Sequence, residues 1–196
     1  GRYQAVGDPQ DIGGRMFFRA KEDGHWYIIA EDGRRIGETY DSVRDPVNIG
    51  NHLFFWAFKD GTYFIVGEDG IPVGDTYELV GYPRDINGRV AFKVQQRKRQ
   101  FIINDEGRRV GEEYDYVDHP VPINGTIAFR ARQSGSEFVV NEKGMKTDRE
   151  FEEIYLLKAL PDGNAYVIAR KSGFIVKEVI RRDFFPLPGV VREDAF

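Results

Sequence analysis

Cysteine is absent from this 196-residue chain, and histidine is scarce, with three copies. The lack of cysteine excludes disulfide bonds, thiol catalysis and cysteine-ligated zinc together. His25, His52 and His119 fall at three different points of the repeat described below, so they are not expected to converge on a metal ion or a catalytic triad. We therefore predict no metal site, no cofactor and no catalytic residue.

Long apolar runs and an excess of positive charge are also missing. No stretch approaches the roughly 18 apolar residues of a membrane-spanning helix, so no membrane span is predicted. The net charge is −4, whereas a nucleic-acid groove needs a positive field, so nucleic acid is not expected as a partner. The first residue is Gly1, which indicates a processed or excised chain. The sequence fixes no compartment, although a secreted or cell-envelope location is favoured.

What the sequence does contain is a period of 37 residues. A period of this size indicates one supersecondary unit that is copied and stacked. Four series of residues follow the period: Ile12, Ile49, Ile86, Ile123 and then Leu160; Pro9, Pro46, Pro83 and Pro120; Phe18, Phe55, Phe92, Phe129 and Tyr166; Tyr3, Tyr40, Tyr77, Tyr114 and Phe151.

The repeat unit is predicted to contain four short strands with turns between them. Asn87-Gly88 and Asn124-Gly125 are strong signals for two-residue hairpins, because a type I′ turn needs positive φ at both central positions. The third strand of each copy, such as 101–103, is apolar without alternation, which predicts cover on both faces of the sheet. The recurring prolines belong on an edge strand or at a strand start, because proline cannot donate to a ladder.

These observations predict an all-β fold: a five-bladed β-propeller in one repeat domain, 1–196, built from four-stranded copies. The copies span 6–42, 43–79, 80–116, 117–153 and 154–190. Tyr3 is in register with Tyr40, so residues 1–5 are predicted to complete the last blade and close the ring. The alternative architecture is an open β-repeat array. Residues 176–183 leave the register and fit either a strand or a short helix, whereas 147–150 are assigned to strand despite a helix-capping pattern.

One segment of the first copy resembles a known family. Gly24-His-Trp26 is followed by an apolar strand, a turn at Gly33 and then Tyr40-Asp41-Ser-Val43, and parts of this pattern recur in later copies. This pattern resembles the WG-repeat family of bacterial proteins, although Tyr27 stands where that family has the glycine after tryptophan. The resemblance implies an interaction scaffold, since such repeats share no known common chemistry.

Three classes of function remain open. The first is a non-enzymatic binding or structural scaffold whose partner is another protein or a second copy of the chain. The second is a carbohydrate-binding lectin with one site in each repeat. The third is a glycosidase-like enzyme that would use two carboxylates from inner strands as acid and base or nucleophile. The candidate carboxylates are Asp8, Asp11, Asp45, Asp85 and Asp118, which also fit ordinary turn residues.

Residues that depart from the repeat are better candidates for a partner-binding site than residues that recur, because recurrence is already explained by folding. Trp56 stands where other copies have Arg19, Lys93 and Arg130, and Arg97-Lys98-Arg99 give one hairpin tip a basic cluster. We predict Trp56, Arg97, Lys98 and Arg99 as partner-binding residues. By the same argument, the acids that recur after the tyrosines are expected to bond turn N–H groups or a neighbouring blade: Asp41, Glu78, Asp115 and Glu152.

Overall fold

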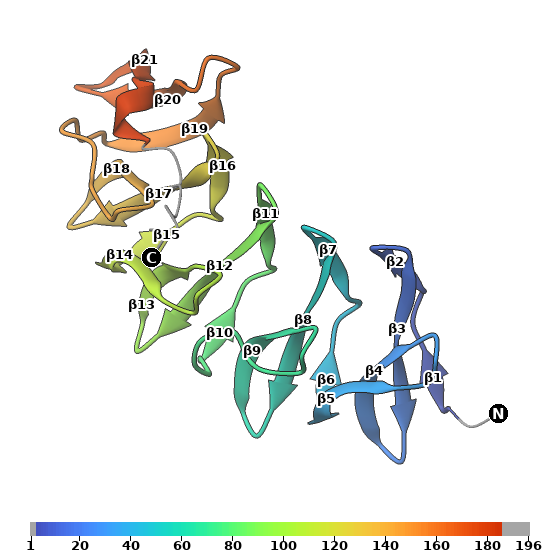
Figure 1. Cartoon of the computed structure of the whole chain (residues 1–196). Helices are drawn as coiled ribbons and strands as arrows, with labels where there is room; N and C mark the ends of the chain where they lie inside the picture. Colours follow the sequence, from blue (N-terminus) through green and yellow to red (C-terminus); the bar gives the residue numbers. More distant parts are fainter. Residues whose placement is uncertain (1–2, 186–196) are drawn as a thin grey trace, which may run out of the picture.

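The computed structural model describes residues 3–185 and shows five antiparallel sheets that follow one another along an open arc (Figure 1). The first sheet contains β1 (Ala5–Val6), β2 (Gln10–Ile12), β3 (Arg15–Glu22), β4 (His25–Ala30) and β5 (Arg35–Tyr40). The second contains β6 (Ser42–Val43), β7 (Val47–Ile49), β8 (His52–Lys59) and β9 (Thr62–Gly67). The third contains β10 (Leu79–Val80), β11 (Arg84–Ile86), β12 (Arg89–Gln96), β13 (Arg99–Ile103) and β14 (Arg109–Tyr114). The fourth contains β15 (Tyr116–Val117), β16 (Val121–Ile123), β17 (Thr126–Gln133) and β18 (Ser136–Asn141), and the fifth β19 (Glu153–Ala159), β20 (Ala165–Lys171) and β21 (Phe174–Ile180).

The chain is thus all-β, as predicted. Within residues 3–185 the one helical segment is the short 3₁₀ turn η1 (Arg182–Phe184). A helix with the length and apolarity to cross a bilayer does not occur in that range. Residues 174–180 form a strand, which settles the choice left open for most of 176–183. The strand assigned to 147–150 was wrong: these residues form neither helix nor strand, because ladder pairing is limited to isolated bridges at the flanking Lys146 and Phe151.

Each of the first four sheets begins with an edge strand in two pieces. β1 and β2 both pair with β3, and Pro9 lies between them, where its missing N–H leaves no gap in the ladder. The same arrangement repeats around Pro46, Pro83 and Pro120, which confirms that the prolines mark an edge. The pieces β2, β7, β11 and β16 and the strand β19 lie on the inner side of the arc (Figure 1).

Apolar side chains fill the space between consecutive sheets, so every inner sheet is buried on both faces. In β9, Phe64 and Val66 pack toward the first sheet, while Ile65 packs toward the third. This confirms the cover predicted for the unalternating third strand. Phe55, Phe92 and Phe129 are fully buried against the sheet that precedes each of them.

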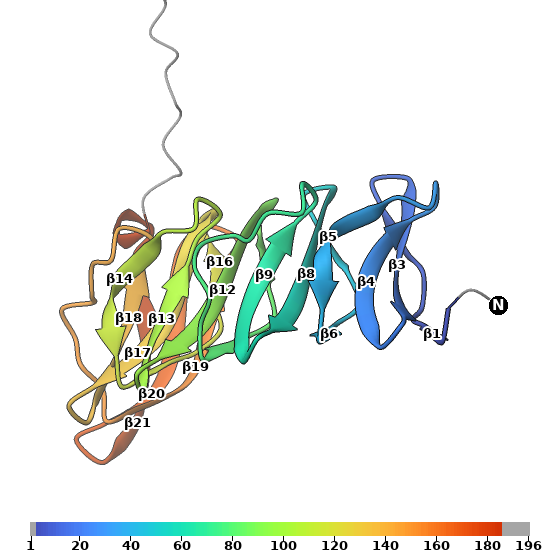
Figure 2. The ribbon, with the colours of Figure 1, turned by 90° about the horizontal axis from the view of Figure 1, so that it is seen from below.

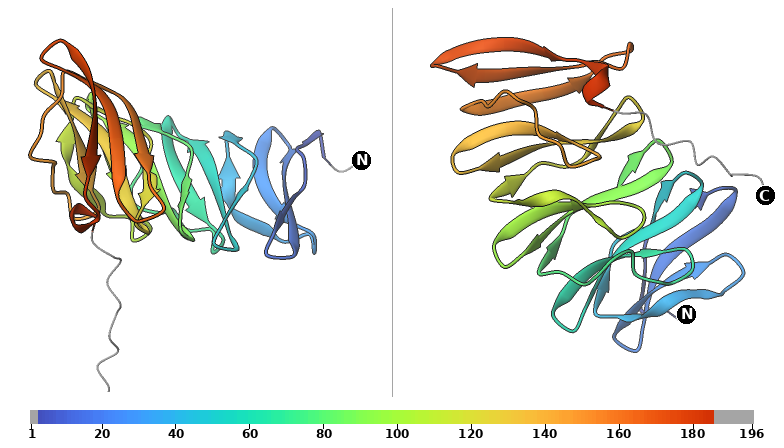
Figure 3. Two further views of the ribbon diagram at one scale, coloured as in Figure 1. Left: turned by 90° about the horizontal axis from the view of Figure 1, so that it is seen from above. Right: turned by 60° about the vertical axis from the view of Figure 1, so that its left-hand side comes forward.

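The prediction that the N-terminal residues close the ring needs correction. Ala5 pairs with Lys21 and Val6 with Ala20, and the Gln4 amide donates to the Lys21 carbonyl at 2.8 Å, so this segment completes the first sheet. The first and fifth sheets stand at opposite ends of the row (Figures 2 and 3). The physical reason is that the adjacent edge of β3 is available locally. Residues 1–2, and 186–190 of the predicted fifth copy, lie outside the described range.

The fifth copy departs from the others by one residue. Turn residues with positive φ fall at Asp23, Asp60, Arg97 and Ser134, which are 37 apart, but the next is Ser172, which is 38 further on. The extra residue enters at the first hairpin. Pro122 pairs with Ile127 across four residues, whereas Ala159, at the equivalent position, pairs with Ala165 across five.

This insertion changes which aromatic position is buried. Val167, with 0% exposure, takes the place that Phe129 has in the fourth sheet, and Tyr166 lies on the opposite, outer face. Placing Tyr166 in the phenylalanine series was therefore wrong, because a shift of one residue exchanges the two faces of a strand.

Candidate functional site

Trp56 occupies a position whose side chain links each sheet to the next. The four side chains at this position each donate to the backbone carbonyl found 24 residues later, at the start of the following sheet. The Trp56 Nε1 donates to the Val80 carbonyl at 3.1 Å and the Lys93 Nζ to the Val117 carbonyl at 2.8 Å. The other two pairs are Arg19 with Val43 and Arg130 with Ile154.

The Trp56 indole therefore makes a hydrogen bond that holds two sheets of the fold together. It is half-buried, and its ring lies 5.0 Å from the Tyr63 ring and 5.5 Å from the Arg44 guanidinium carbon. Although the residue type breaks the repeat, its hydrogen bond does not. Packing between the sheets therefore accounts for Trp56, and a contact between Trp56 and a partner stays a prediction.

In the basic tip, Arg97-Lys98-Arg99, the first two residues are exposed and the third forms contacts within its own sheet and with the next. Arg97 and Lys98 form the two-residue turn between β12 and β13, and both are exposed. Arg99 pairs with the Asp115 carboxylate and donates to the Glu113 carbonyl at 2.7 Å. Trp56 lies in the middle of β8 in the neighbouring sheet, so the structure does not join all four predicted residues into one site.

Lys98 has an unfavourable backbone conformation. Its φ is 65°, in the left-handed region that glycine adopts without a steric penalty. The corresponding turn position is glycine in the other four copies: Gly24, Gly61, Gly135 and Gly173. A residue that breaks a local rule of the fold without visible structural compensation is a candidate for a functional role.

We expect Lys98→Gly to raise the free energy of unfolding by about 1 kcal/mol, since a left-handed conformation costs a residue with a Cβ roughly 1–2 kcal/mol, part of which is offset by glycine's greater entropy in the unfolded chain. Urea denaturation would measure the change. Gly61→Lys, at the same turn of the second sheet, should lower stability by a similar amount. Destabilisation by Lys98→Gly would show that the lysine side chain supports the fold.

The acids that recur after the tyrosines have the structural role predicted for them. Each accepts a hydrogen bond from the first turn residue of the next long hairpin, or from its neighbour. The four bonds join Asp41 to the Asp60 amide at 3.0 Å, Glu78 to Arg97 at 3.1 Å, Asp115 to Ser134 at 2.9 Å and Glu152 to Gly173 at 3.0 Å.

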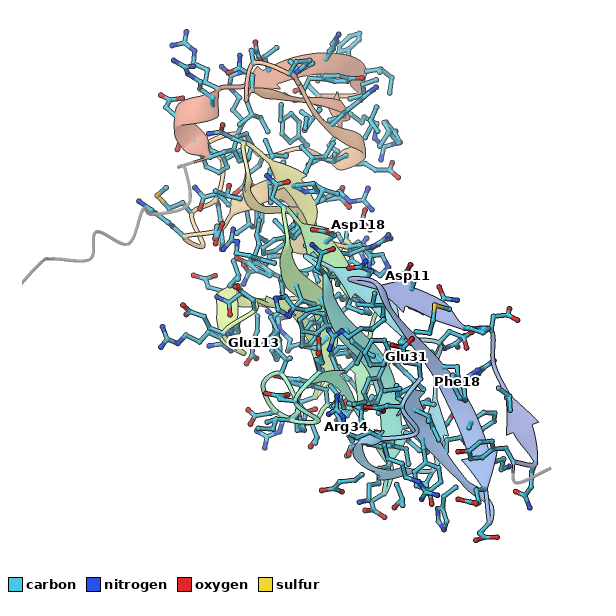
Figure 4. All side chains as sticks on the ribbon, turned by 45° about the vertical axis from the view of Figure 1, so that its right-hand side comes forward. Asp11, Phe18, Glu31, Arg34, Glu113 and Asp118 are labelled. Atoms are coloured by element: carbon cyan, nitrogen blue, oxygen red, sulfur yellow. The ribbon has the colours of Figure 1, made fainter. Side chains whose placement is uncertain are left out.

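Four of the five candidate inner-strand aspartates, all except Asp8, use their carboxylates in contacts within the chain. Asp11 and Asp85 accept from the amides of Gly14 and Gly88 within their own turns, at 2.9 and 2.6 Å. Asp45 pairs with Arg19 at 2.8 Å and Asp118 with Arg130 at 3.3 Å. Asp11 and Asp118, both labelled in Figure 4, belong to the first and fourth sheets. These contacts favour the turn interpretation over a catalytic pair.

The three histidines lie on different sheets, as the repeat register predicts. Burial, together with the positive charges of Arg84 and Lys93, lowers the pKa of His119, so the neutral imidazole is favoured there. Among residues 3–185, no group of three or more acidic or histidine side chains is arranged to hold a metal ion.

Sequence reasoning missed two features between the sheets. The first is that the side chains of Gln100 and Glu137 accept hydrogen bonds from the amides of Val117 and Ile154, at 3.1 and 2.6 Å. Lys93 and Arg130 donate to the carbonyls of the same two residues, so each of them is held at both its N–H and its C=O. The second feature is a hollow of about 620 Å³ beside His52, between the second and third sheets. The sequence signal for this hollow is that His52 occupies, in the second copy, the repeat position that is Arg15 in the first copy and Arg89 in the third.

No known family and no curated protein matches this chain. Solved structures that are similar to this chain include two that cover most of it. One is "KlHsv2 with loop 6CD replaced by a Gly-Ser linker", with a TM-score of 0.41 and 12% identity over 86% of this chain and 61% of that chain. The other is BBS1N in a structure of its complex with ARL6DN, with a TM-score of 0.33 and 12% identity over 84% of this chain and 64% of that chain. The chain therefore spans less than two thirds of the length of either.

Proposed function

We propose that this chain is a non-enzymatic interaction scaffold that binds an acidic protein surface through Arg97 and Lys98. In this proposal the five sheets are blade-like repeats of the WG type that present the tip on a rigid frame. The observation that carries the proposal is the exposed lysine held at positive φ where the other copies have glycine.

The charges around the tip support this proposal. The polar groups of Arg99 and Glu78 are used within the chain, whereas the side chains of Arg97 and Lys98 are exposed. The recurring acidic and basic side chains contact other sheets or their own turns, which explains them by folding. Two adjacent cations on a hairpin tip suit an acidic polypeptide, and attraction between exposed charges should be screened over about 8 Å at physiological ionic strength.

A deca-glutamate peptide is a direct probe of this function. We expect Arg97→Ser/Lys98→Gly to weaken its binding at least tenfold at low ionic strength, measured by fluorescence anisotropy, and we expect salt to weaken binding to the parent. The charge-matched control is Arg34→Ser/Arg108→Ser, which removes two exposed arginines elsewhere and should change affinity less than twofold.

Equal weakening by both double variants would contradict a site at the tip. A glycan array measures the lectin alternative. Several equivalent, salt-insensitive sugar sites that survive the tip substitutions would replace the scaffold proposal with the lectin.

A further inference from the structure

Two ion pairs each join one sheet to the next, the first sheet to the second and the third sheet to the fourth, and both lie beside the turns that follow β9 and β18. Arg15, at the start of β3, pairs with Glu68 of the next sheet at 2.5 Å. Arg89, at the start of β12, pairs with Glu142 at 2.5 Å, and its second terminal nitrogen donates to the other carboxylate oxygen at 3.0 Å. In both cases the arginine crosses to a carboxylate that lies 53 residues later.

The second sheet lacks this crossing. His52 is the residue in register with Arg15 and Arg89, and Asp105 is the carboxylate that it would meet. Both side chains are shorter than those in the other pairs. The His52 ring is 70% exposed and lies 3.8 Å from Glu68 of its own sheet, while the cation contact of Asp105 is Arg89, 3.9 Å away. The hollow of about 620 Å³ lies at this point and includes His52 and Asp105 in its lining.

A second cation is missing from the same place. In three sheets a basic side chain at one repeat position covers an aromatic ring: Arg35 at the start of β5 over Tyr27 at 3.9 Å, Arg109 at the start of β14 over Phe101 at 5.6 Å, and Lys146, in an isolated bridge, over Phe138 at 5.0 Å. The second sheet has Pro72 at this position, and Pro72 also lines the hollow.

Carboxylates surround the hollow, and their cation contacts come from arginines outside its lining: Glu68 pairs with Arg15 at 2.5 Å, Asp105 lies 3.9 Å from Arg89, and Glu106 pairs with Arg108 at 3.0 Å. Glu68, Asp69, Asp105 and Glu106 all line it, and His52 is the one basic side chain among its lining residues. Phe54, Ile71 and Val73 supply apolar walls. The equivalent place in the repeat lies between the first and second sheets, beside the turn that carries Glu31 and Arg34, both labelled in Figure 4. There Arg15 of the first sheet reaches Glu68 of the second. The chain's own repeats favour a guanidinium as the ligand of these carboxylates, because Glu68 and Glu142, at the positions equivalent to Asp105, each hold one.

We infer that the hollow between the second and third sheets binds the guanidinium group of an arginine side chain from a partner polypeptide. Asp105 and Glu106 would accept hydrogen bonds from the guanidinium, as Glu142 does from Arg89, and the apolar walls would contact the aliphatic stem. This inference rests on the proposed scaffold function, but it uses no residue of the basic tip.

The test is an NMR titration of the full chain with blocked arginine, N-acetyl-arginine amide. The comparison ligands are N-acetyl-citrulline amide, which has the same shape without the charge, and N-acetyl-lysine amide. We expect arginine to bind at least tenfold more tightly than citrulline and more tightly than lysine, with shifts at His52 and Asp105. Equal affinity for arginine and citrulline would overturn the inference.

Two substitutions localise the binding. His52→Arg should restore the crossing to Asp105, fill the hollow and weaken binding of blocked arginine at least tenfold. Asp105→Asn should weaken it to a similar extent. His25→Arg is the matched control, because His25 is exposed in a turn of the first sheet, and it should leave the affinity unchanged. Unchanged binding by the folded His52→Arg variant would place the arginine elsewhere and overturn the site.

Two further measurements complete the test. One distinguishes a polypeptide from a small molecule as the source of the guanidinium, and the other distinguishes failure of this inference from failure of the proposed function. Gly-Arg-Gly amide should bind at least as tightly as free agmatine, whereas binding of agmatine alone would exclude a polypeptide ligand. Arg97→Ser/Lys98→Gly should keep the affinity for blocked arginine. A parent chain that binds deca-glutamate but no arginine would refute this inference alone, and the reverse result would refute the proposed role of the tip alone.

Discussion

Phe92→Ala is expected to lower the free energy of unfolding by about 3–5 kcal/mol, the range for removing a large aromatic side chain from a packed core. Phe92 is 0% exposed and lies in the core between the second and third sheets. Its removal deletes buried apolar surface and leaves a cavity that rigid strands on both sides are poorly able to fill. Equilibrium denaturation in urea, followed by far-UV circular dichroism, would measure the change.

Phe174→Ala is the matched control for this substitution. Phe174 is 74% exposed, at the start of β21 in the last sheet, so its removal should cost less than about 0.5 kcal/mol, as for ordinary surface positions. A loss below about 1 kcal/mol for Phe92→Ala would mean that the strand faces the other way, because one residue of register exchanges its faces.

Gly70→Ala is expected to lower stability by about 3 kcal/mol or more, as overpacking against backbone adds to the cost of a left-handed residue. Consecutive sheets approach each other here through their backbones. A Cβ on Gly70 would lie 2.7 Å from the Gly37 nitrogen and 2.8 Å from its Cα, and neither atom is able to rotate away. The approach recurs between Gly107 and Gly74 and between Gly144 and Gly111.

Gly61→Ala separates the two contributions to that loss. Gly61 has a φ of 81°, close to the 80° of Gly70, but a Cβ there would meet nothing within 4 Å. It should therefore cost about 1 kcal/mol, which is the conformational contribution alone. Equal losses from the two substitutions, measured by urea denaturation, would show that the sheets separate easily at Gly70 and that the close approach contributes nothing.

Much of the fold could be predicted from local signals. The period, the two-residue turns at Asn87-Gly88 and the apolar run at 101–103 specified strands, their order and their burial on both faces. The structural role of Asp41 and its equivalents also followed, because a residue that recurs in every copy must satisfy a demand that recurs. The resemblance to the WG repeats remains a prediction.

The candidate site was less predictable. Trp56 breaks the repeat in sequence, yet its indole forms the same bond to the next sheet as a lysine or an arginine does. Residue type alone does not reveal this, because the acceptor is a backbone carbonyl. The hollow beside His52 was missed for the opposite reason: a histidine among arginines attracts attention only once Arg15 and Arg89 are seen to cross between sheets.

The sequence by itself determined the repeat, the strands, the turns and the absence of cysteine chemistry, because each depends on residues within one copy. The tertiary structure decided that the arc stays open, that one extra residue turns Tyr166 outward, and which cations the second sheet lacks. The cations that cross between sheets depend on contacts between residues 24 or 53 positions apart on different sheets. Such contacts are fixed by how rigid sheets stack, and no local pattern in the chain encodes them.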